Sequence, residues 1–194
     1  MINSMETSRA ELLHYVIDTR ASRFTVQAFA TGVLAAMGHN PKIGVRSFRG
    51  EVDFDSETPQ ASGFRLSMRS DSFSVLDDVS DKDRREIERM MNEQVLEVTK
   101  YPEILYEAPT VSVTRLESTL YSATLNGNLS FHGLTRSQPL SARIAEFGEM
   151  LRTSGDFTLR QSDFGIKPIS VAGGALKVKD ELKFSFEMIV RKKE

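Results

Sequence analysis

The feature that most constrains this chain is a strict alternation of apolar and charged side chains. Residues 48–55 are FRGEVDFD, so the even positions are apolar or glycine and the odd positions are all charged. A period of two residues places successive side chains on opposite faces of a β-strand. This segment is therefore predicted to be a strand with one dry face and one wet face.

The same alternation returns along most of the chain, with turn residues between the segments. The strands that it predicts cover residues 15–18, 22–31, 42–55, 64–69, 103–115, 118–131, 138–147, 150–160 and 182–190. Without βαβ alternation, about eight such strands are expected to be antiparallel and to close into a barrel wide enough for side chains or for one ligand. Gly44 and Gly50, and a bulge after Gly155, are expected to bend this sheet.

One segment departs from the strand pattern. From residue 81 to residue 95, Ile87, Met90, Met91 and Val95 recur at helical spacing with charges between them. Ser80 and Asp83 have the spacing of a capping box. We predict one amphipathic helix whose methionine-bearing face packs on the sheet or covers one end of it.

Composition excludes several classes of function. A formal net charge of -2 leaves no broad basic face for nucleic acid. The absence of cysteine rules out disulfides, thiolate metal ligands and a cysteine nucleophile. The sequence has no apolar run of transmembrane length and no recognisable secretory signal, which favours the cytoplasm, with the periplasm as the alternative if a signal has been removed.

No arrangement of residues typical of catalysis stands out. The three histidines, at positions 14, 39 and 132, form no pair at a helical i, i+4 spacing and lie near no carboxylate cluster with metal-ligand spacing. Serine-hydrolase, Walker and dinucleotide glycine motifs are also absent, and Gly173-Gly174 is interpreted as a hairpin turn. We expect no catalytic residue, no metal and no cofactor.

Four short motifs carry a family resemblance. Residues 127–136, GNLSFHGLTR, resemble the hairpin G-[DN]-L-[TS]-h-H-G-h-T-[KR] of the YceI-like family, where h is apolar. In the same order and spacing, residues 101–104 resemble its entry into a central strand, and residues 160–166 resemble its D-F-G turn. Residues 22–24, with 38–39 and 48–50, resemble its first hairpin. The match differs in two respects, because no secretory signal is visible and the usual Asn-Arg before the D-F-G turn is replaced by LRQS at 159–162.

The resemblance implies a mainly β fold, an antiparallel lipocalin-like β-barrel of about eight strands with one amphipathic α-helix. It covers roughly Arg20 to Val190, so we assign residues 20–191 to a lipid-binding barrel domain and residues 1–19 to an N-terminal tail with a first short strand. Relatives in this family imply a homodimer. Members of the family bind polyisoprenoid lipids, and inward faces of Phe, Leu, Val and Met fit that class because they offer no charge to a polar metabolite.

These arguments give two sets of candidate ligand-binding residues. The first would line an apolar tunnel, with plain core packing as the alternative for each residue: Phe24, Val26, Phe48, Val52, Phe54, Phe64, Leu66, Met68, Leu129, Phe131, Phe184 and Phe186. The second set would hold the polar head group at the mouth: His39, His132, Arg160 and Lys167.

The function expected from the sequence is the binding and carrying of a long apolar lipid, a polyisoprenoid, inside the barrel. Two alternatives remain open. The same barrel could be an enzyme acting on a hydrophobic substrate, which would need a histidine with a positioned partner. The protein could instead be a stress or regulatory protein that uses the barrel only as a scaffold and docks a partner on helix 81–95.

Overall fold

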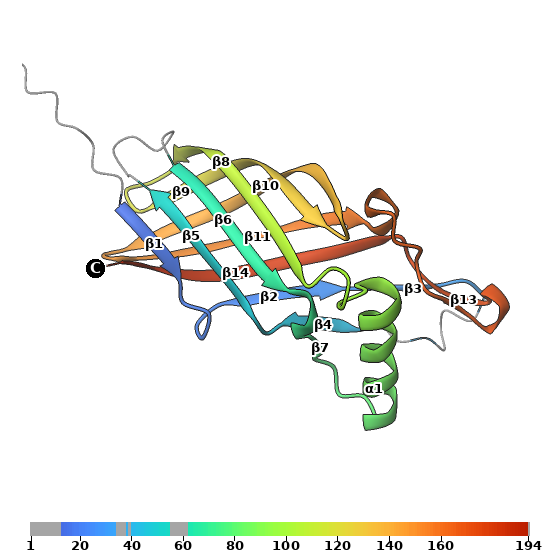
Figure 1. Cartoon of the computed structure of the whole chain (residues 1–194). Helices are drawn as coiled ribbons and strands as arrows, with labels where there is room; N and C mark the ends of the chain where they lie inside the picture. The colour runs from blue at the N-terminus through green and yellow to red at the C-terminus, as the bar shows by residue number, and fades with distance from the viewer. Residues whose placement is uncertain (1–12, 34–37, 39, 55–61, 194) are drawn as a thin grey trace, which may run out of the picture.

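The computed structural model describes residues 13–33, 38, 40–54 and 62–193, and it shows a mainly β protein (Figure 1). The residues 1–12 that include most of the expected tail lie outside this range. The strands are β1 (Leu13–Ile17), β2 (Arg23–Gln27), β3 (Ala30–Thr31), β4 (Lys42–Val45), β5 (Phe48–Phe54), β6 (Ser62–Arg69), β7 (Phe73–Val75), β8 (Glu103–Arg115), β9 (Leu120–Phe131), β10 (Leu134–Phe147), β11 (Met150–Arg160), β12 (Ser170–Val171), β13 (Leu176–Val178) and β14 (Glu181–Lys192). The helical elements are α1 (Asp81–Met90), the π-helical turn η4 (Met91–Val95), and the 3-10 turns η3 (Ser70–Ser72), η5 (Gln161–Phe164) and η6 (Ala172–Gly174).

The large sheet closes on itself. Its strands follow the order β1-β5-β6-β8-β9-β10-β11-β14, and β14 pairs back onto β1, with Val190 opposite Ile17. All of these pairings are antiparallel. The predicted antiparallel barrel of about eight strands with a single α-helix is therefore confirmed.

One wall of the barrel is built from strands that lie end to end. β14 pairs with β1 through residues 190–192 and with β2 through residues 183–187. Asp18 lies at the junction, where its carboxylate accepts a hydrogen bond of 2.9 Å from Arg191 Nε. β1 also pairs with β5, so the strand that the sequence grouped with the tail is part of the barrel wall.

In the described part of the chain, strand β7 lies at an unpaired edge of the large sheet. β7 pairs with β4, and among the described residues no strand pairs with its other edge. Helix α1, which follows β7 in the chain, occupies this position at one end of the barrel (Figure 1). Glu88 Oε1 accepts a 2.9 Å hydrogen bond from the Val75 amide, and the Arg84 guanidinium donates to the Val75 carbonyl and, at 2.9 Å, to the Asp77 carbonyl. Two charged side chains thus satisfy the Val75 amide and carbonyl on the β7 edge in place of a neighbouring strand.

Helix α1 begins as its sequence predicts. Ser80 is the N-cap, and its hydroxyl oxygen accepts a hydrogen bond of 3.1 Å from the Asp83 amide. The helical segment continues to Val95, but its last part is π-helical rather than α-helical. Met91, the first residue of this turn, is buried beside the barrel interior.

A second, three-stranded sheet extends beyond the same end of the barrel (Figure 1). Its order is β12-β13-β3, so it joins a late hairpin to a segment near the start of the chain. Gly173 and Gly174 turn the hairpin with φ of 63° and 91°, a left-handed conformation that glycine adopts without strain. This confirms their predicted role in a turn.

The alternation of apolar and charged residues over 48–55 is confirmed for its described residues, 48–54. Phe48 and Phe54 are buried, whereas Arg49, Glu51 and Asp53 are exposed. The bulge expected after Gly155 is wrong, because the β11–β14 register runs unbroken from Met150 to Arg160. Gly155 is needed for a different reason, since a β-carbon there would lie 2.6 Å from Phe186 Cζ and 2.5 Å from the Ser141 carbonyl oxygen.

Candidate ligand cavity in the barrel

The barrel encloses a cavity of about 320 Å³. The described barrel strands from β2 to β14, helix α1 with η4, and the small β12-β13-β3 sheet all contribute to its wall. Almost every lining side chain is aliphatic or aromatic, so a polar ligand would lose its water without gaining hydrogen bonds. Long apolar chains would gain by entering it.

Most of the residues predicted to line a tunnel do lie on the wall of this cavity. They are Phe24, Val26, Val52, Phe54, Phe64, Leu66, Met68, Leu129, Phe131, Phe184 and Phe186. Phe48 is buried but is not part of the wall, so for this residue the alternative of plain core packing fits the structure. The alternation of the strand could not show that Phe54 lines the cavity and Phe48 does not, since both side chains point into the barrel.

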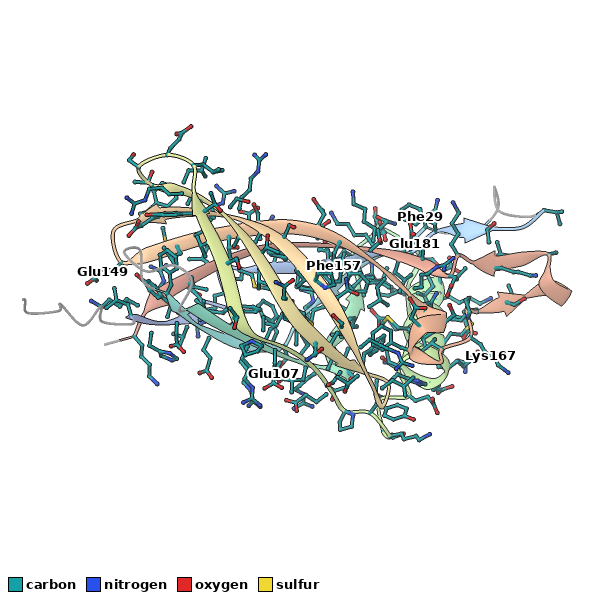
Figure 2. The ribbon with its side chains drawn as sticks, turned by 90° about the horizontal axis from the view of Figure 1, so that it is seen from above. Phe29, Glu107, Glu149, Phe157, Lys167 and Glu181 are labelled. Carbon is teal, nitrogen blue, oxygen red and sulfur yellow. The ribbon has the colours of Figure 1, made fainter. Side chains whose placement is uncertain are left out.

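Four phenylalanines form one cluster on the cavity wall. Phe24 packs edge-on against Phe157 and Phe184, with ring centroids 6.4 Å and 6.2 Å apart, and lies roughly parallel to Phe186 at 6.4 Å. Phe157 and Phe184 stack at 4.8 Å, and Phe157 lies within the outline of the barrel (Figure 2). Such aromatic pairs hold the side chains at fixed positions and leave flat apolar surfaces toward the cavity.

Helix α1 and η4 supply a part of the wall that the sequence analysis interpreted differently. Ile87, Met90, Met91 and Val95 face the cavity rather than only the protein core. Methionine suits such a position because its flexible thioether adapts to irregular contents. The helical spacing of these residues was visible in the sequence, but the surface they cover depends on where the barrel opens.

The residues predicted to hold a head group at the mouth are not brought together. His132, Arg160 and Lys167 are absent from the described cavity wall, and His39 lies outside the described residues. Arg160 is exposed and its Nε lies 3.9 Å from Asp180 Oδ2. Lys167 is exposed at the end of the barrel that carries the small sheet, opposite the end that carries Glu149 (Figure 2).

His132 instead connects three segments of the fold. Its Nε2 lies 2.5 Å from Glu97 Oε2 and its Nδ1 lies 3.2 Å from the Phe164 carbonyl oxygen. The ring also packs on Tyr101, with centroids 4.4 Å apart. Both Glu97 and His132 have a positive φ, 43° and 49°, which non-glycine residues adopt rarely. The histidine of the family-like motif thus joins the end of η4 to the β9–β10 turn and to η5.

Polar lining residues are few, and the sequence analysis did not identify them. They are Tyr106, Gln138, Thr153, Gln161 and Lys177. Tyr106 donates its hydroxyl hydrogen to the carbonyl of Gln138 at 3.0 Å, and burial raises the pKa of this phenol to about 12. Gln161 is 2 % exposed and donates its side-chain amide to the Lys179 carbonyl at 2.9 Å. The protein therefore already uses the polar groups of Tyr106 and Gln161.

A second polar group, the pair of Tyr121 and Glu146, lies toward the barrel end opposite the small sheet. The hydroxyl of Tyr121, which is 1 % exposed, donates to Glu146 Oε2 at 2.9 Å. Burial, followed by the bond to Glu146, raises the pKa of Tyr121, and burial with the charges of Glu146 and Glu149 raises the pKa of Tyr15. Phe54 lines the cavity and packs on both tyrosines, so buried aromatic rings close this end.

Metal and membrane features are limited to two findings. In the described part of the chain, no three or more His, Cys, Asp or Glu side chains come together as metal ligands. The helices in that part are too short or too polar to cross a membrane.

A closed antiparallel barrel around one apolar cavity, with a helix at one end, defines a lipocalin-like barrel. Comparison with known proteins places the chain within this class. A family model described as the YceI-like domain matches residues 15–190, and the chain belongs to the YceI-like family. It is also similar to the UPF0312 protein of Azotobacter vinelandii, with 26% identity over 160 residues that cover 79% of this chain and 76% of that protein.

Solved structures share the fold at low sequence identity. BcnA of Burkholderia cenocepacia superposes with a TM-score of 0.64 at 16% identity, covering 89% of this chain and 98% of that one. A polyisoprenoid binding domain from Saccharophagus degradans superposes with a TM-score of 0.67 at 12% identity, covering 94% of this chain and 100% of that one. These matches show a common barrel architecture.

Proposed function

We propose that this protein binds and carries a long apolar lipid of the polyisoprenoid class within the barrel. The observation that carries this proposal is the 320 Å³ cavity with its almost wholly apolar wall. A barrel that only needed stability would fill this space with its own side chains, since interiors are normally packed to crystal-like density. Space left along an apolar wall is what a ligand of the same character would occupy.

The energetics favour a chain of several isoprene units. Burying one five-carbon unit contributes about 4 kcal/mol gross, at about 0.8 kcal/mol for each methylene-sized group. Ordering the chain and losing its free motion costs part of this gain, so two or three buried units are needed for tight binding. The structural likeness to a polyisoprenoid binding domain supports the same class of ligand.

The contacts of His132 favour binding over catalysis. A general acid or base needs a ring nitrogen that can reach the substrate. Both nitrogens of His132 face protein acceptors, the Glu97 carboxylate and the Phe164 carbonyl. In this arrangement His132 holds the fold together and does not face the cavity.

The proposal is tested by measuring bound lipid with matched charge insertions. Leu129 and Asn128 are neighbours on β9, but Leu129 lines the cavity and Asn128 is exposed on the outer face. We expect native mass spectrometry of the wild-type protein and of Asn128→Glu to show uptake of added geranylgeraniol, and Leu129→Glu to lose it. No uptake by a folded wild-type protein would contradict the proposal, and so would full uptake by a folded Leu129→Glu variant.

A further inference from the structure

Lys177 is the one charged residue on the described wall of the cavity, and it is exposed to solvent. It lies in β13, the middle strand of the small sheet that extends from the barrel end. Its ammonium group makes no hydrogen bond or ion pair with the residues that the structure describes. A cation without a partner at the edge of an apolar cavity is available to a ligand whose charge is opposite.

The segment that carries Lys177 contains lysines and no acid, and the exposed acids Asp163 and Glu181 lie just outside its two ends in sequence. Residues 164–179 contain Lys167, Lys177 and Lys179 but no Asp or Glu. Residues 29–33, which reach the same end through β3, contain no acid. The nearest acid in sequence, Asp180, is already engaged, because its carboxylate accepts hydrogen bonds from Ser162 and faces Arg160.

The charges on the opposite side of this barrel end compensate one another. On helix α1, Arg89 forms ion pairs of 2.8 Å and 2.7 Å with Glu86 and Glu93, and Glu88 and Arg84 bind the backbone of β7. An anionic group arriving at this end would therefore be drawn toward the small sheet rather than toward the helix.

The Lys177 side chain lies close over Gly174 in the hairpin turn. A β-carbon at Gly174 would lie 3.3 Å from Lys177 Cε, 3.8 Å from its Nζ and 3.8 Å from Ser170 Oγ. The Lys177 ammonium and the Ser170 hydroxyl therefore lie near the same point above Gly174. Both could donate to the same oxygen-rich group.

From this geometry we propose that the barrel takes amphiphiles with an anionic head group, a carboxylate or a phosphate, and that Lys177 binds the head while the tail lies in the cavity. The inference rests on the proposed function and deepens it by naming the head group. It also replaces Arg160 and Lys167 as head-group residues, since Lys177 is on the cavity wall and they are not.

Three ligands with one tail test this proposal: farnesol, farnesoic acid and farnesyl monophosphate. Their affinities are measured by calorimetry for the wild type, Lys177→Gln, Lys177→Glu and the control Lys167→Gln, an exposed lysine at the same barrel end. We expect an anionic ligand to bind the wild type about tenfold more tightly than farnesol, the strength of a partly exposed charge-assisted bond. Salt at about 1 M should reduce this preference.

The variants separate the head group from the tail. Lys177→Gln should abolish the preference and leave farnesol affinity unchanged, Lys177→Glu should reverse it, and Lys167→Gln should retain it. A preference limited to the acid or to the phosphate would identify the head group. Equal affinities for the three ligands in the wild type, or a preference that survives in Lys177→Gln, would overturn the role of Lys177 while leaving lipid binding intact. Failure of all three ligands to bind would overturn the proposed function itself.

Discussion

Substituting Ala142 by phenylalanine should shorten the cavity from its closed end. Ala142 lies on β10, lines the cavity and pairs with Ala123 on β9. Strand β10 begins at Leu134, next to the His132 turn. Ala142 is eight residues further on, so it lies about 27 Å from Leu134 along the strand. With a strand tilt of about 40°, this corresponds to a depth of about 20 Å along the barrel axis. A ring added here would block the deep part of the cavity and leave the mouth unchanged.

The expected loss of affinity follows from the carbon atoms displaced. Phenylalanine adds a six-carbon ring to the alanine side chain, so a ligand that reaches this depth loses about the same number of buried carbons. At about 0.8 kcal/mol for each, the loss is at most about 5 kcal/mol, and a relaxed chain would lose about 3 kcal/mol, or more than a hundredfold in affinity. Short ligands that end above Ala142 should lose nothing.

The assay compares geraniol with its twice-longer homologue geranylgeraniol by calorimetry. Ala142→Phe should weaken geranylgeraniol strongly and spare geraniol, whereas Ser141→Phe, which adds the same ring to an exposed position of the same strand, should affect neither. Thermal unfolding of both variants checks that the barrel is intact. Unchanged geranylgeraniol affinity in a folded Ala142→Phe protein, or an equal loss for both alcohols, would show that the chain does not reach this depth.

Three further predictions concern stability. Burial raises the pKa of Tyr106 to about 12, so folding keeps this phenol neutral. Its contribution to the free energy of unfolding should be complete below about pH 10 and should decline as the pH rises through about 12. Tyr106→Phe should reduce this alkaline decline in denaturant titrations. Glu97→Gln should lower the free energy of unfolding by about 1 kcal/mol, because it removes the charge from the bond to His132, and an unchanged urea midpoint would refute this. Gly127→Ala should cost about 1–3 kcal/mol, since its β-carbon would lie 2.5 Å from the Tyr106 hydroxyl; thermal unfolding at wild-type temperature would show that the ring moves away freely.

Alternation along the chain was enough to predict the long strands and the barrel, because side-chain direction in a strand depends only on local geometry. It joined β2 to β3 and β4 to β5 as single strands, and it missed the short strands β7, β12 and β13. Ser80 and Asp83 likewise predicted the start of helix α1, since a cap bonds to its own first turn. The strand predicted over 42–55 is divided in the structure into β4 and β5, but the predicted inward faces of Phe48 and Phe54 are both buried.

The cavity mouth could not be predicted in this way. Lys177 lies in a strand of three residues, too short for alternation to reveal which side faces the cavity. His132 was expected at the mouth because its motif resembles a family signature, but its direction is set by Glu97, thirty-five residues away in sequence. Such contacts depend on how distant segments meet, and a single sequence does not contain that information in any local pattern.

The edge of β7 that helix α1 covers has a consequence for how this protein avoids self-association. A strand edge with free amide and carbonyl groups is a template for pairing with another chain, which leads to aggregation. At Val75 both groups are already bonded, by Glu88 and Arg84 from helix α1. Helix α1 therefore acts as an edge protector as well as a part of the cavity wall, and any movement that lifts it from β7 exposes the edge at which a second copy could add a strand.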